Sequence, residues 1–391
     1  MNFELNEEQQ ALRDSLQRLL RDTYGFDQRR ALVASASGWS EPVWRKLIEL
    51  GACGLLVPAE SGGFGGRNED VLPVMQSLGV ALSMEPYLAC AVLAATALRS
   101  VPPSQVARQA LESIATGDGV IVWAHDEAGM RGSPGRLQTC AHRDGSDWVL
   151  NGEKCNVLHG DHASAFVVTA QVQPHKQNPP IGKSDQALFL VQAKGNGVQR
   201  DSYRLVDDTP AADLLFADVY AQPLCLDDTL AQEAIRATLN AGVAAACADA
   251  VGAMSAAFEL ASNYVQTRRQ FGRLIGENQA LRHRLADMFV SLEMCRSMAI
   301  AAAVAADRAS ETNEPREPDA ALDLMRAKLM IGQHARAVCH GAIQLHGGIG
   351  MTEEYAVGHY LRRVTLLDQL FGDVDTQAAS LGDLLALQSG A

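Results

Sequence analysis

Four residues between positions 268 and 279 have the types and the spacing of an anion-binding corner. Arg268 follows an apolar helical run, Phe271-Gly272 interrupts that run, and Gln279 stands seven residues beyond the glycine. A guanidinium at the carboxyl end of a helix suits the helix dipole and can donate two hydrogen bonds to a phosphate. An amide can bond a polar edge of the same ligand. A helix hairpin with a solvated basic end would show the same pattern, so both interpretations stay open at this point.

A second segment with chemical potential runs from Gln344 to Tyr355. It contains an amide followed by Gly347, Gly348 and Gly350. Glycines allow a backbone to approach a ligand closely. A helix end followed by a turn would use the same residues, so the segment alone does not decide between these alternatives.

One carboxylate, Asp249, lies within the apolar run Ala244 to Gly252. A buried carboxylate costs free energy unless it is paired or functional. Asp249 is therefore a candidate general base, and a bond to a polar neighbour is the structural alternative.

Three successive stretches with different patterns of apolar and polar residues must position these residues. Residues 1–118 predict amphipathic helices, residues 119–227 predict short alternating strands, and residues 228–391 predict helices again. We expect an α+β multidomain fold with an N-terminal helical domain, a central antiparallel β-barrel or sandwich and a C-terminal four-helix bundle.

Local signals set the expected element boundaries. The helices predicted in the first stretch are Glu7 to Leu20, Glu41 to Leu50 after the N-cap Ser40, and Asp70 to Leu82. Two dipeptides, Asp144-Gly145 and Asn151-Gly152, predict hairpin turns because both tolerate positive φ. The polar stretches Gln173 to Asp185 and Asp307 to Pro318 predict exposed connections.

Composition narrows the class of protein. The formal net charge of the 391-residue chain is -13, which disfavours a nucleic-acid partner. Eight cysteines without a CxxC pair suit reduced thiols in a cytoplasmic protein and predict neither a disulfide framework nor a metal site. The acidic N-terminus is unlike a signal peptide. We expect that no apolar run approaches the roughly 20 residues needed to span a bilayer, and therefore that the chain has no membrane-spanning segment.

The order Tyr264, Arg268, Phe271-Gly272, Gln279 resembles the signature of the acyl-CoA dehydrogenases, which are FAD-dependent enzymes. The segment from Gln344 looks like the family's Gln-x-x-Gly-Gly-x-Gly motif, and the phrase from Trp44 to Pro58 is similar to its N-terminal domain. The resemblance thus covers nearly the whole chain. It implies that FAD is held across a dimer interface by Arg268, Phe271, Gln279, Gln344, Gly347 and Gly348.

The resemblance also implies a reaction. Family members remove an α-proton and a β-hydride from an acyl-CoA thioester to give the 2-enoyl-CoA and reduced FAD. The expected partners are an acyl-CoA substrate, an electron-transfer flavoprotein as electron acceptor, and either further copies in a homodimer or tetramer or a related subunit in a heteromer. The reaction needs a desolvated carboxylate as base.

The usual base is missing from this chain. Most members place a Glu sixteen residues after the Tyr that closes the glycine segment, and Phe371 stands there. A minority place it twenty-six residues before the pyrophosphate-binding Arg, and Gly242 stands there. Asp249 is seven residues and about two helical turns beyond Gly242, so it is our candidate catalytic base. Asp373 and Asp375 fall where the family contacts FAD, and we expect them to bind the cofactor's hydroxyls.

The central stretch departs from the family as well. Asn156 and Leu158 replace a Trp and a Thr that approach the flavin ring, and only Glu127 survives from another flavin-facing phrase. The adenosine half of the FAD site is therefore better supported than the flavin half.

These observations give three hypotheses. The first is a dehydrogenase of an unusual, bulky or cyclic acyl-CoA, from fatty acid or from sterol and ring catabolism, with Asp249 as base. The alternative is a base-less FAD-binding subunit of a heteromeric acyl-CoA dehydrogenase. A related flavin monooxygenase or nitroalkane-type oxidase is the third, and rapid oxygen consumption would distinguish it.

Overall fold

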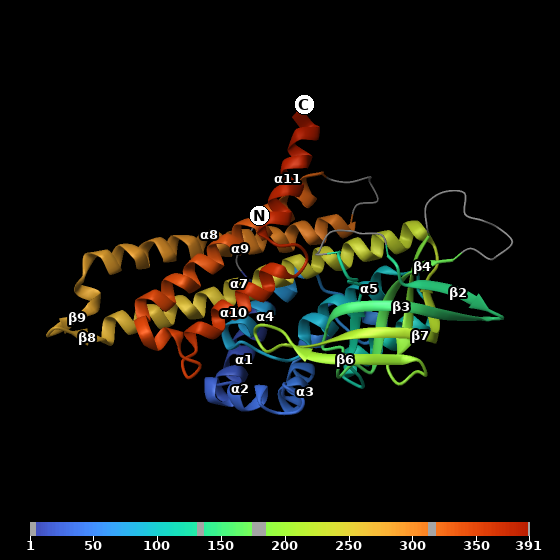
Figure 1. Cartoon of the computed structure of the whole chain (residues 1–391), viewed down its shortest axis with the longest axis horizontal. Helices are drawn as coiled ribbons and strands as arrows, with labels where there is room; N and C mark the ends of the chain where they lie inside the picture. The colour runs from blue at the N-terminus through green and yellow to red at the C-terminus, as the bar shows by residue number, and fades with distance from the viewer. Residues whose placement is uncertain (1–4, 131–136, 174–184, 312–317, 390–391) are drawn as a thin grey trace. The chain divides into compact units, whose positions relative to one another are not determined.

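The computed structural model describes residues 5–130, 137–173, 185–311 and 318–389 (Figure 1). Its contacts divide the chain into two compact units that do not follow chain order. Unit 1 comprises Met1–Ala34, Asn68–Ser83 and Val243–Ala391, and unit 2 comprises Ser35–Arg67 and Met84–Gly242.

Unit 1 is helical. Its helices are α1 (Glu7–Thr23), α2 (Phe26–Val33), α4 (Asn68–Ala81), the second part of α7 (Asp228–Thr267), α8 (Gln279–Glu311), α9 (Pro318–His346), α10 (Val357–Gln369) and α11 (Val374–Ser389). Short 3₁₀ helices are η4 (Ile275–Glu277) and η5 (Gly347–Met351), and the strands β8 (Arg269–Gln270) and β9 (Arg273–Leu274) form a hairpin.

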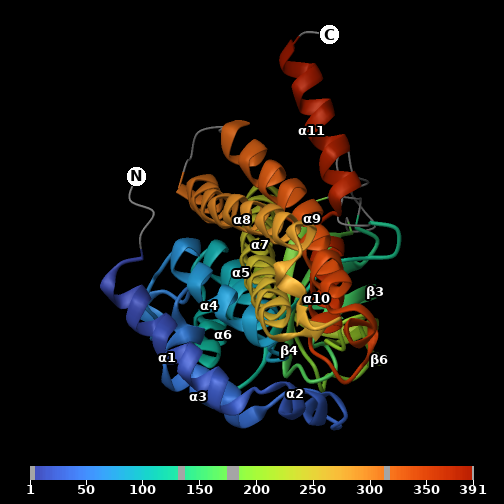
Figure 2. The same ribbon diagram turned by 90° about the vertical axis from the view of Figure 1, so that its left-hand side faces the viewer.

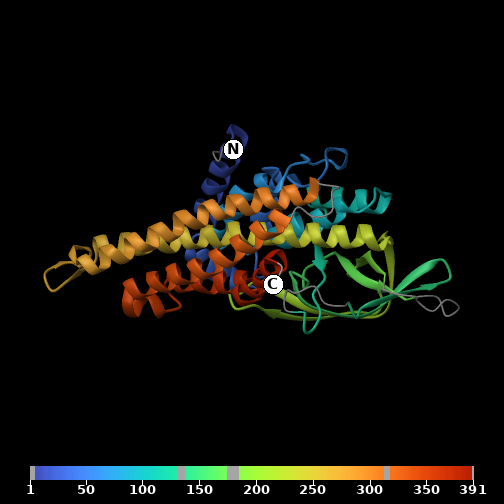
Figure 3. The same ribbon diagram turned by 90° about the horizontal axis from the view of Figure 1, so that it is seen from above.

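The C-terminal helices of unit 1 pack against α9. Helix α9 lies beside α8 and carries α10 and α11 on its other sides (Figures 1 and 3). Helix α11 is the red helix that leads to the C-terminus in Figure 2. Helix α4 packs on α1 and α8.

Helices α4 and α7 approach each other closely at two glycines. A Cβ at Gly79 would lie 2.2 Å from the backbone oxygen of Asp249, and a Cβ at Gly252 would lie 2.1 Å from that of Gln76. Contacts shorter than van der Waals distance exclude any side chain at these positions. The two glycines are therefore required for the crossing.

Unit 2 combines helices with a sheet. Its helical elements are α3 (Glu41–Glu49), η1 (Ala52–Gly54), η2 (Ala59–Ser61), the π-helix η3 (Tyr87–Ala94), α5 (Ala95–Ser100), α6 (Gln105–Thr116) and the first part of α7. Its strands are β1 (Ile121–Ala124), β2 (Cys140–Asp144), β3 (Asp147–Leu158), β4 (Ala165–Val172), β5 (Gln186–Gln192), β6 (Val198–Arg204) and β7 (Pro210–Cys225).

The strands of unit 2 close into a barrel. Strand β4 pairs with β2 and β5, β2 pairs with β3, β3 with β7, and β7 with β5. Strands β1 and β6 extend the sheet from β4 and β7. Only the β1–β4 and β2–β4 pairs are parallel, and the rings of Phe166, Phe189 and Phe216 fill the interior.

Most predicted elements are confirmed. The three N-terminal helices occur as α1, α3 and α4, and Ser40 Oγ accepts a hydrogen bond from the Val43 amide as the N-cap of α3. Strands β2 and β3 meet at a turn in which Gly145 has a φ of 62°, as predicted.

Two local predictions are wrong. Asn151-Gly152 is a bulge inside β3 and not a turn, because Gly152, with a φ of 141°, passes so close to Thr139 that a Cβ would lie 2.6 Å from its Cα. The break predicted from Asp307 begins later, since α8 continues to Glu311. Most of the predicted loop from Gln173 to Asp185 lies outside the described residues.

Two helices in the described part of the chain are long and apolar enough to cross a membrane by length and composition alone. They are α7, whose most apolar window is 83% buried, and α8, whose window is 39% buried. The expectation that no apolar run reaches this length is thus wrong. In α7 the burial accounts for the composition, because a core helix needs apolar residues on every side.

Candidate functional site

The predicted anion-binding corner is a two-stranded β-hairpin at the end of α7 (Figure 1). Helix α7 ends at Thr267, and the Arg268 amide still donates to the Tyr264 carbonyl at 2.8 Å. Phe271 and Gly272 form the tip with φ values of 51° and 80°. Positive φ at both central residues is the geometry of a tight two-residue turn. The hairpin then leads through η4 into α8 at Gln279.

The corner presents the side chains of the predicted site residues to the surface. Arg268 and Gln279 are exposed, and the Phe271 ring is 101% exposed. In the amide orientation that satisfies its donors and acceptors, Gln270 Oε1 accepts from Arg268 Nη2 at 2.7 Å. This bond steadies the guanidinium and leaves further N–H groups for an anion.

His346 joins the corner to the second motif. Its ring lies 4.5 Å from the Tyr264 ring and 4.9 Å from the Tyr355 ring, between centroids. Its Nδ1 donates to the Ala342 carbonyl at 2.7 Å, so Nε2 is the acceptor for the Tyr355 hydroxyl at 3.1 Å. Burial lowers the pKa of His346 and outweighs the opposite effect of the Ala342 bond, which keeps the ring neutral.

The glycine segment offers open backbone. Gly347 has a φ of 66°, and nothing lies within 4 Å of a Cβ built at Gly347 or Gly348. Gln344 is exposed on the last turn of α9. Because Tyr264 precedes Arg268 by one helical turn, the contact between Tyr264 and His346 brings both predicted motifs to one region of unit 1.

Asp249 is buried and ion-paired. It is 4% exposed, and its Oδ2 lies 3.8 Å from Nη1 of Arg363, which is 7% exposed and comes from α10. The sequence predicts a helix around Asp249, as α7 shows, but it does not predict the ion pair with Arg363. Nothing in the sequence links two residues on helices that are distant along the chain.

The two positions that residue counting predicts for the base, Gly242 and Phe371, hold no carboxylate. Gly242 is buried in α7, and Phe371 follows α10 with a φ of 60°. Gln377 Nε2 donates to the Phe371 carbonyl at 3.0 Å, and Asp373 Oδ1 accepts from the Thr376 amide at 2.9 Å. Asp373 therefore serves as a cap for α11, and Asp375 is exposed in its first turn.

In unit 2 a polar cluster occupies the segment that departs from the family. The Asn156 amide, at a φ of 54°, donates to Asp213 Oδ1 at 2.9 Å, and the Tyr203 hydroxyl donates to the same oxygen at 2.7 Å. Burial and the Asp213 carboxylate raise the pKa of Tyr203. This cluster joins β3, β6 and β7, and it uses the Asn156 side chain, which bonds Tyr203 at 3.1 Å.

A charged network lies inside the barrel. Lys154 Nζ is fully buried and donates to Glu127 Oε1 at 2.6 Å and to the His125 carbonyl at 3.1 Å. Burial lowers the pKa of Lys154 to about 8 despite the carboxylate. Burial acts to raise the pKa of Glu127, but Lys154 and the amides of Gln138 and Thr139 outweigh it and lower that pKa. The network fixes the start of the 126–130 segment on β3.

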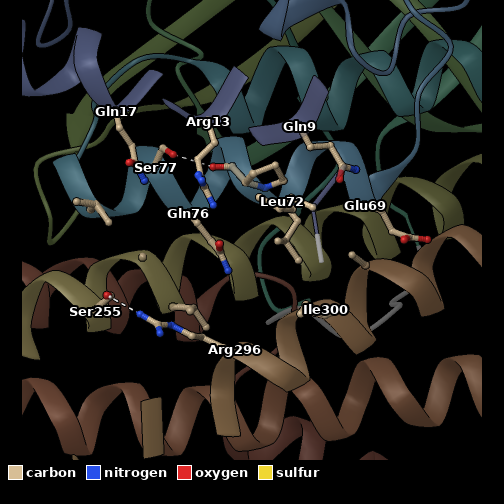
Figure 4. A pocket seen from close by; sticks show the side chains of 16 residues that line it. Gln9, Arg13, Gln17, Glu69, Leu72, Gln76, Ser77, Ser255, Arg296 and Ile300 are labelled. Carbon is tan, nitrogen blue, oxygen red and sulfur yellow. Dashed lines mark hydrogen bonds between the residues drawn. The ribbon is translucent and has the colours of Figure 1, made fainter. Parts of the chain in front are cut away.

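A cavity of about 370 Å³ lies within unit 1 (Figure 4). Helices α1, α4, α7 and α8 line it, and Arg13 and Arg296 reach it from opposite sides. Each guanidinium already pairs with an acid on its own helix, Asp14 or Glu293. None of the predicted site residues lines this cavity.

The residues of the chain fit FAD unequally. In unit 1, the exposed guanidinium of Arg268, the phenyl ring of Phe271 and the open backbone at Gly347 and Gly348 suit the pyrophosphate and adenosine of the cofactor. In unit 2, Asn156 offers a small polar group at the position where the resemblance implies a flat aromatic ring. FAD would supply the hydride acceptor of the reaction.

Comparison with family models covers most of the chain. Residues 6–118 match the acyl-CoA dehydrogenase N-terminal domain, residues 124–219 the middle domain and residues 232–385 the C-terminal domain. All three occur in the order of the predicted architecture, which is thereby confirmed.

Individual relatives align along their whole length. The chain is 29% identical over 375 residues to the probable acyl-CoA dehydrogenase YngJ of Bacillus subtilis, with 94% of this chain and 95% of the relative covered. It is 29% identical over 358 residues to the acyl-CoA dehydrogenase IpdE2 of Mycobacterium tuberculosis, with 91% of each covered. A solved variant of the Tcur3481-Tcur3483 steroid ACAD is 26% identical, with a TM-score of 0.84 over 98% of this chain and 99% of that chain.

The comparisons support the cofactor and the substrate class that the motifs predict. FAD is the cofactor of this group of oxidoreductases, and an acyl-CoA is their substrate, as the motifs predict. The chain belongs to the acyl-CoA dehydrogenase family.

Proposed function

We propose that this chain is an FAD-binding subunit of an acyl-CoA dehydrogenase that relies on a related partner subunit for the catalytic base. The observation that carries this proposal is the buried pair of Asp249 with Arg363. A guanidinium beside a carboxylate stabilises its charged form. A base for a weakly acidic C–H needs the opposite, an environment that raises its affinity for the proton. With Phe371 and Gly242 at the positions counted for the base, the proposal takes the base from another chain.

The unequal fit to FAD supports the same proposal. Unit 1 keeps the elements that hold the adenosine half, which family members contribute across a dimer interface. Unit 2 has the Asn156, Tyr203 and Asp213 cluster at the segment that faces the flavin in the family. A subunit that completes the site of its partner needs the elements that hold the adenosine half of FAD. It does not need the residues that face the flavin ring.

Asp249 as a base in its own right is the second candidate. Its place on α7, about two turns beyond Gly242, and its burial among alanines favour this assignment. In that case the chain dehydrogenates an acyl-CoA alone.

The substrate class we propose is a bulky or cyclic acyl-CoA. The small residues Gly242 and Ala246 of α7, both buried, are the sequence feature that motivates this class. The name of one solved relative, a steroid ACAD that pairs Tcur3481 with Tcur3483, fits both a ring substrate and two different subunits. We propose an electron-transfer flavoprotein as the electron acceptor.

Purification of the chain alone and together with a paralogue from the same genome tests the proposal. The paralogue chosen keeps Glu at the position of Phe371. We expect no bleaching of bound flavin by a panel of acyl-CoA thioesters with the isolated chain, and bleaching with the co-purified pair. Bleaching by the isolated chain that Asp249→Asn abolishes would support the second candidate instead.

Flavin content tests the corner separately. Arg268→Gln removes a charge-assisted bond to the pyrophosphate, so FAD affinity should fall by about 10-fold or more. Arg273→Gln is the matched control in the same hairpin, because Arg273 already donates to Asn278 Oδ1 at 2.7 Å. Equal losses in the two variants would contradict the assignment of Arg268.

A further inference from the structure

Helix α4 is held at its N-terminus by a buried carboxylate. Asp307 of α8 accepts from the Asn68 amide and from Asn68 Nδ2, both at 2.8 Å, and from the Glu69 amide at 3.2 Å. Asn68 and Asp307 are each 4% exposed. A negative charge at the first amides of a helix stabilises it through the helix dipole.

The C-terminus of α4 is held by donors from two other helices. The Tyr360 hydroxyl donates to the Val80 carbonyl at 2.8 Å, and Arg29 Nε donates to the Leu82 carbonyl at 3.1 Å. Arg363 Nη2 donates to the Ser83 carbonyl. Cations at the last carbonyls of a helix are the counterpart of the acid at its start.

Asp249 completes this arrangement. It pairs with Arg363, while its backbone packs against Gly79 in the last turn of α4. Arg363 is almost fully buried, and a buried guanidinium needs a compensating charge. Asp249 is one such charge, and its pair with Arg363 links the cap on Ser83 to Asp249.

Helix α4 belongs to unit 1, whereas the stretches of chain before and after it belong to unit 2. Unit 2 ends at Arg67 before α4 and resumes at Met84 after it. One face of α4, including Leu72, Gln76 and Val80, also lines the 370 Å³ cavity of unit 1. The position of α4 thus sets both the cavity wall and the points at which the chain leaves unit 1.

We infer that Asp249 is a positioning residue that fixes the end of α4 through Arg363, and that it is not the proton acceptor. This inference rests on the proposed function only in taking the base from a partner subunit. It predicts that loss of the Asp249 charge loosens α4, and that the same loss leaves the pH dependence of flavin reduction unchanged.

Hydrogen exchange gives the first test, on the full chain. Asp249→Asn should speed exchange of the α4 amides by about 10-fold or more, since each factor of ten corresponds to about 1.4 kcal/mol of local stability, and should spare the amides of α9. In an Arg363→Gln background the same change should add less than about 3-fold, because coupled residues are not additive. Asp323→Asn, which removes an exposed partner of Arg326 on α9, is the control and should change nothing.

The pH profile of flavin reduction by an acyl-CoA, measured on the assembled subunits, gives the second test. We expect Asp249→Asn and Arg363→Gln to slow the reduction by similar factors with the same pH dependence. Loss of more than about 1000-fold in Asp249→Asn alone, with the limb on the acidic side removed and α4 exchange unchanged, would overturn the inference.

Two further results keep the tests distinct. If Asp249→Asn does not fold, Arg363→Lys is used, and faster α4 exchange supports the inference while unchanged exchange overturns it. If the isolated chain bleaches with acyl-CoA, the proposed function fails, and the exchange comparison still decides the role of Asp249.

Discussion

The ring of His346 packs 4.5 Å from the ring of Tyr264, between centroids, and thereby joins the last turn of α7 to the last turn of α9. The Nε2 of His346 also accepts a hydrogen bond from the Tyr355 hydroxyl, beyond the glycine segment. The neutral imidazole is thus the link between the Arg268 corner and the open backbone at Gly347.

The first prediction concerns this link. His346→Ala removes the ring contact and the Tyr355 bond, so both segments lose their mutual support, and FAD affinity should fall by about 10-fold. The measurement is a titration of FAD into the apoprotein followed by flavin fluorescence. His334→Ala is the control, because His334 contacts Ser291 on α8 and neither motif. An unchanged FAD affinity in His346→Ala would remove the proposed link.

The second prediction concerns the crossing of α4 and α7. Ala is usually the better helix residue by about 1 kcal/mol, but Gly79→Ala would place a Cβ 2.2 Å from the Asp249 carbonyl oxygen. We expect a loss of about 1–3 kcal/mol in the free energy of unfolding. Gly382→Ala in α11 meets no atom within 4 Å and should stabilise by about 0.5–1 kcal/mol. Urea denaturation of the two variants should show opposite shifts.

The third prediction concerns the ion pair inside the barrel. Glu127→Gln leaves the fully buried Lys154 ammonium without its carboxylate, which should cost about 3–5 kcal/mol. Glu153→Gln changes an exposed acid next to Lys154 on β3 and should have little effect. Thermal unfolding followed by circular dichroism distinguishes them, and similar melting temperatures would show that the pair contributes little.

The fourth prediction concerns pH. Burial, helped by the Lys154 charge, lowers the pKa of His125 to about 3. Because this folded-state pKa lies below the ordinary value of 6.5, the unfolded chain takes up the proton first. The stability contributed by the neutral ring is full above about pH 6.5 and falls by about 1.4 kcal/mol per pH unit toward pH 3.

His125→Gln keeps a polar side chain beside Thr169 and removes the titration. The decline of melting temperature between pH 6.5 and pH 4 should therefore be shallower in this variant than in the parent. His142→Gln on β2 serves as control in the same sheet. Equal slopes for the parent and His125→Gln would place the acid sensitivity elsewhere.

Local signals carried much of the fold prediction. The N-cap at Ser40 and the turn at Gly145 act over a few residues, so the sequence alone identifies them. The hairpin turn predicted at Asn151-Gly152 was wrong because a bulge and a turn require the same backbone freedom. Only the contact with Thr139, which is distant in sequence, decides between them. The site followed the same rule: the spacing from Arg268 to Gln279 predicted the hairpin corner.

Contacts distant in sequence escaped prediction for the same reason. The ion pair with Arg363 changes the role that we infer for Asp249. Arg363 lies on another helix and matches no motif connected with Asp249. His346 lies beside the glycine motif. Its structural role is a ring contact with Tyr264, which the spacing of residues in the sequence does not predict.

The anchors of α4 also have a consequence for how the chain is made. Asn68 and Asp307 are separated by 239 residues, and Arg363 lies 280 residues beyond Ser83. At about 5–20 residues per second a ribosome needs roughly 12–50 s to make the first of these partners after α4 emerges. During that interval α4 lacks the anchors from Asp307, Tyr360 and Arg363, and only Arg29, which precedes it in the chain, is already made. Helix α4 therefore reaches its fully anchored state only after the chain has been made as far as Arg363.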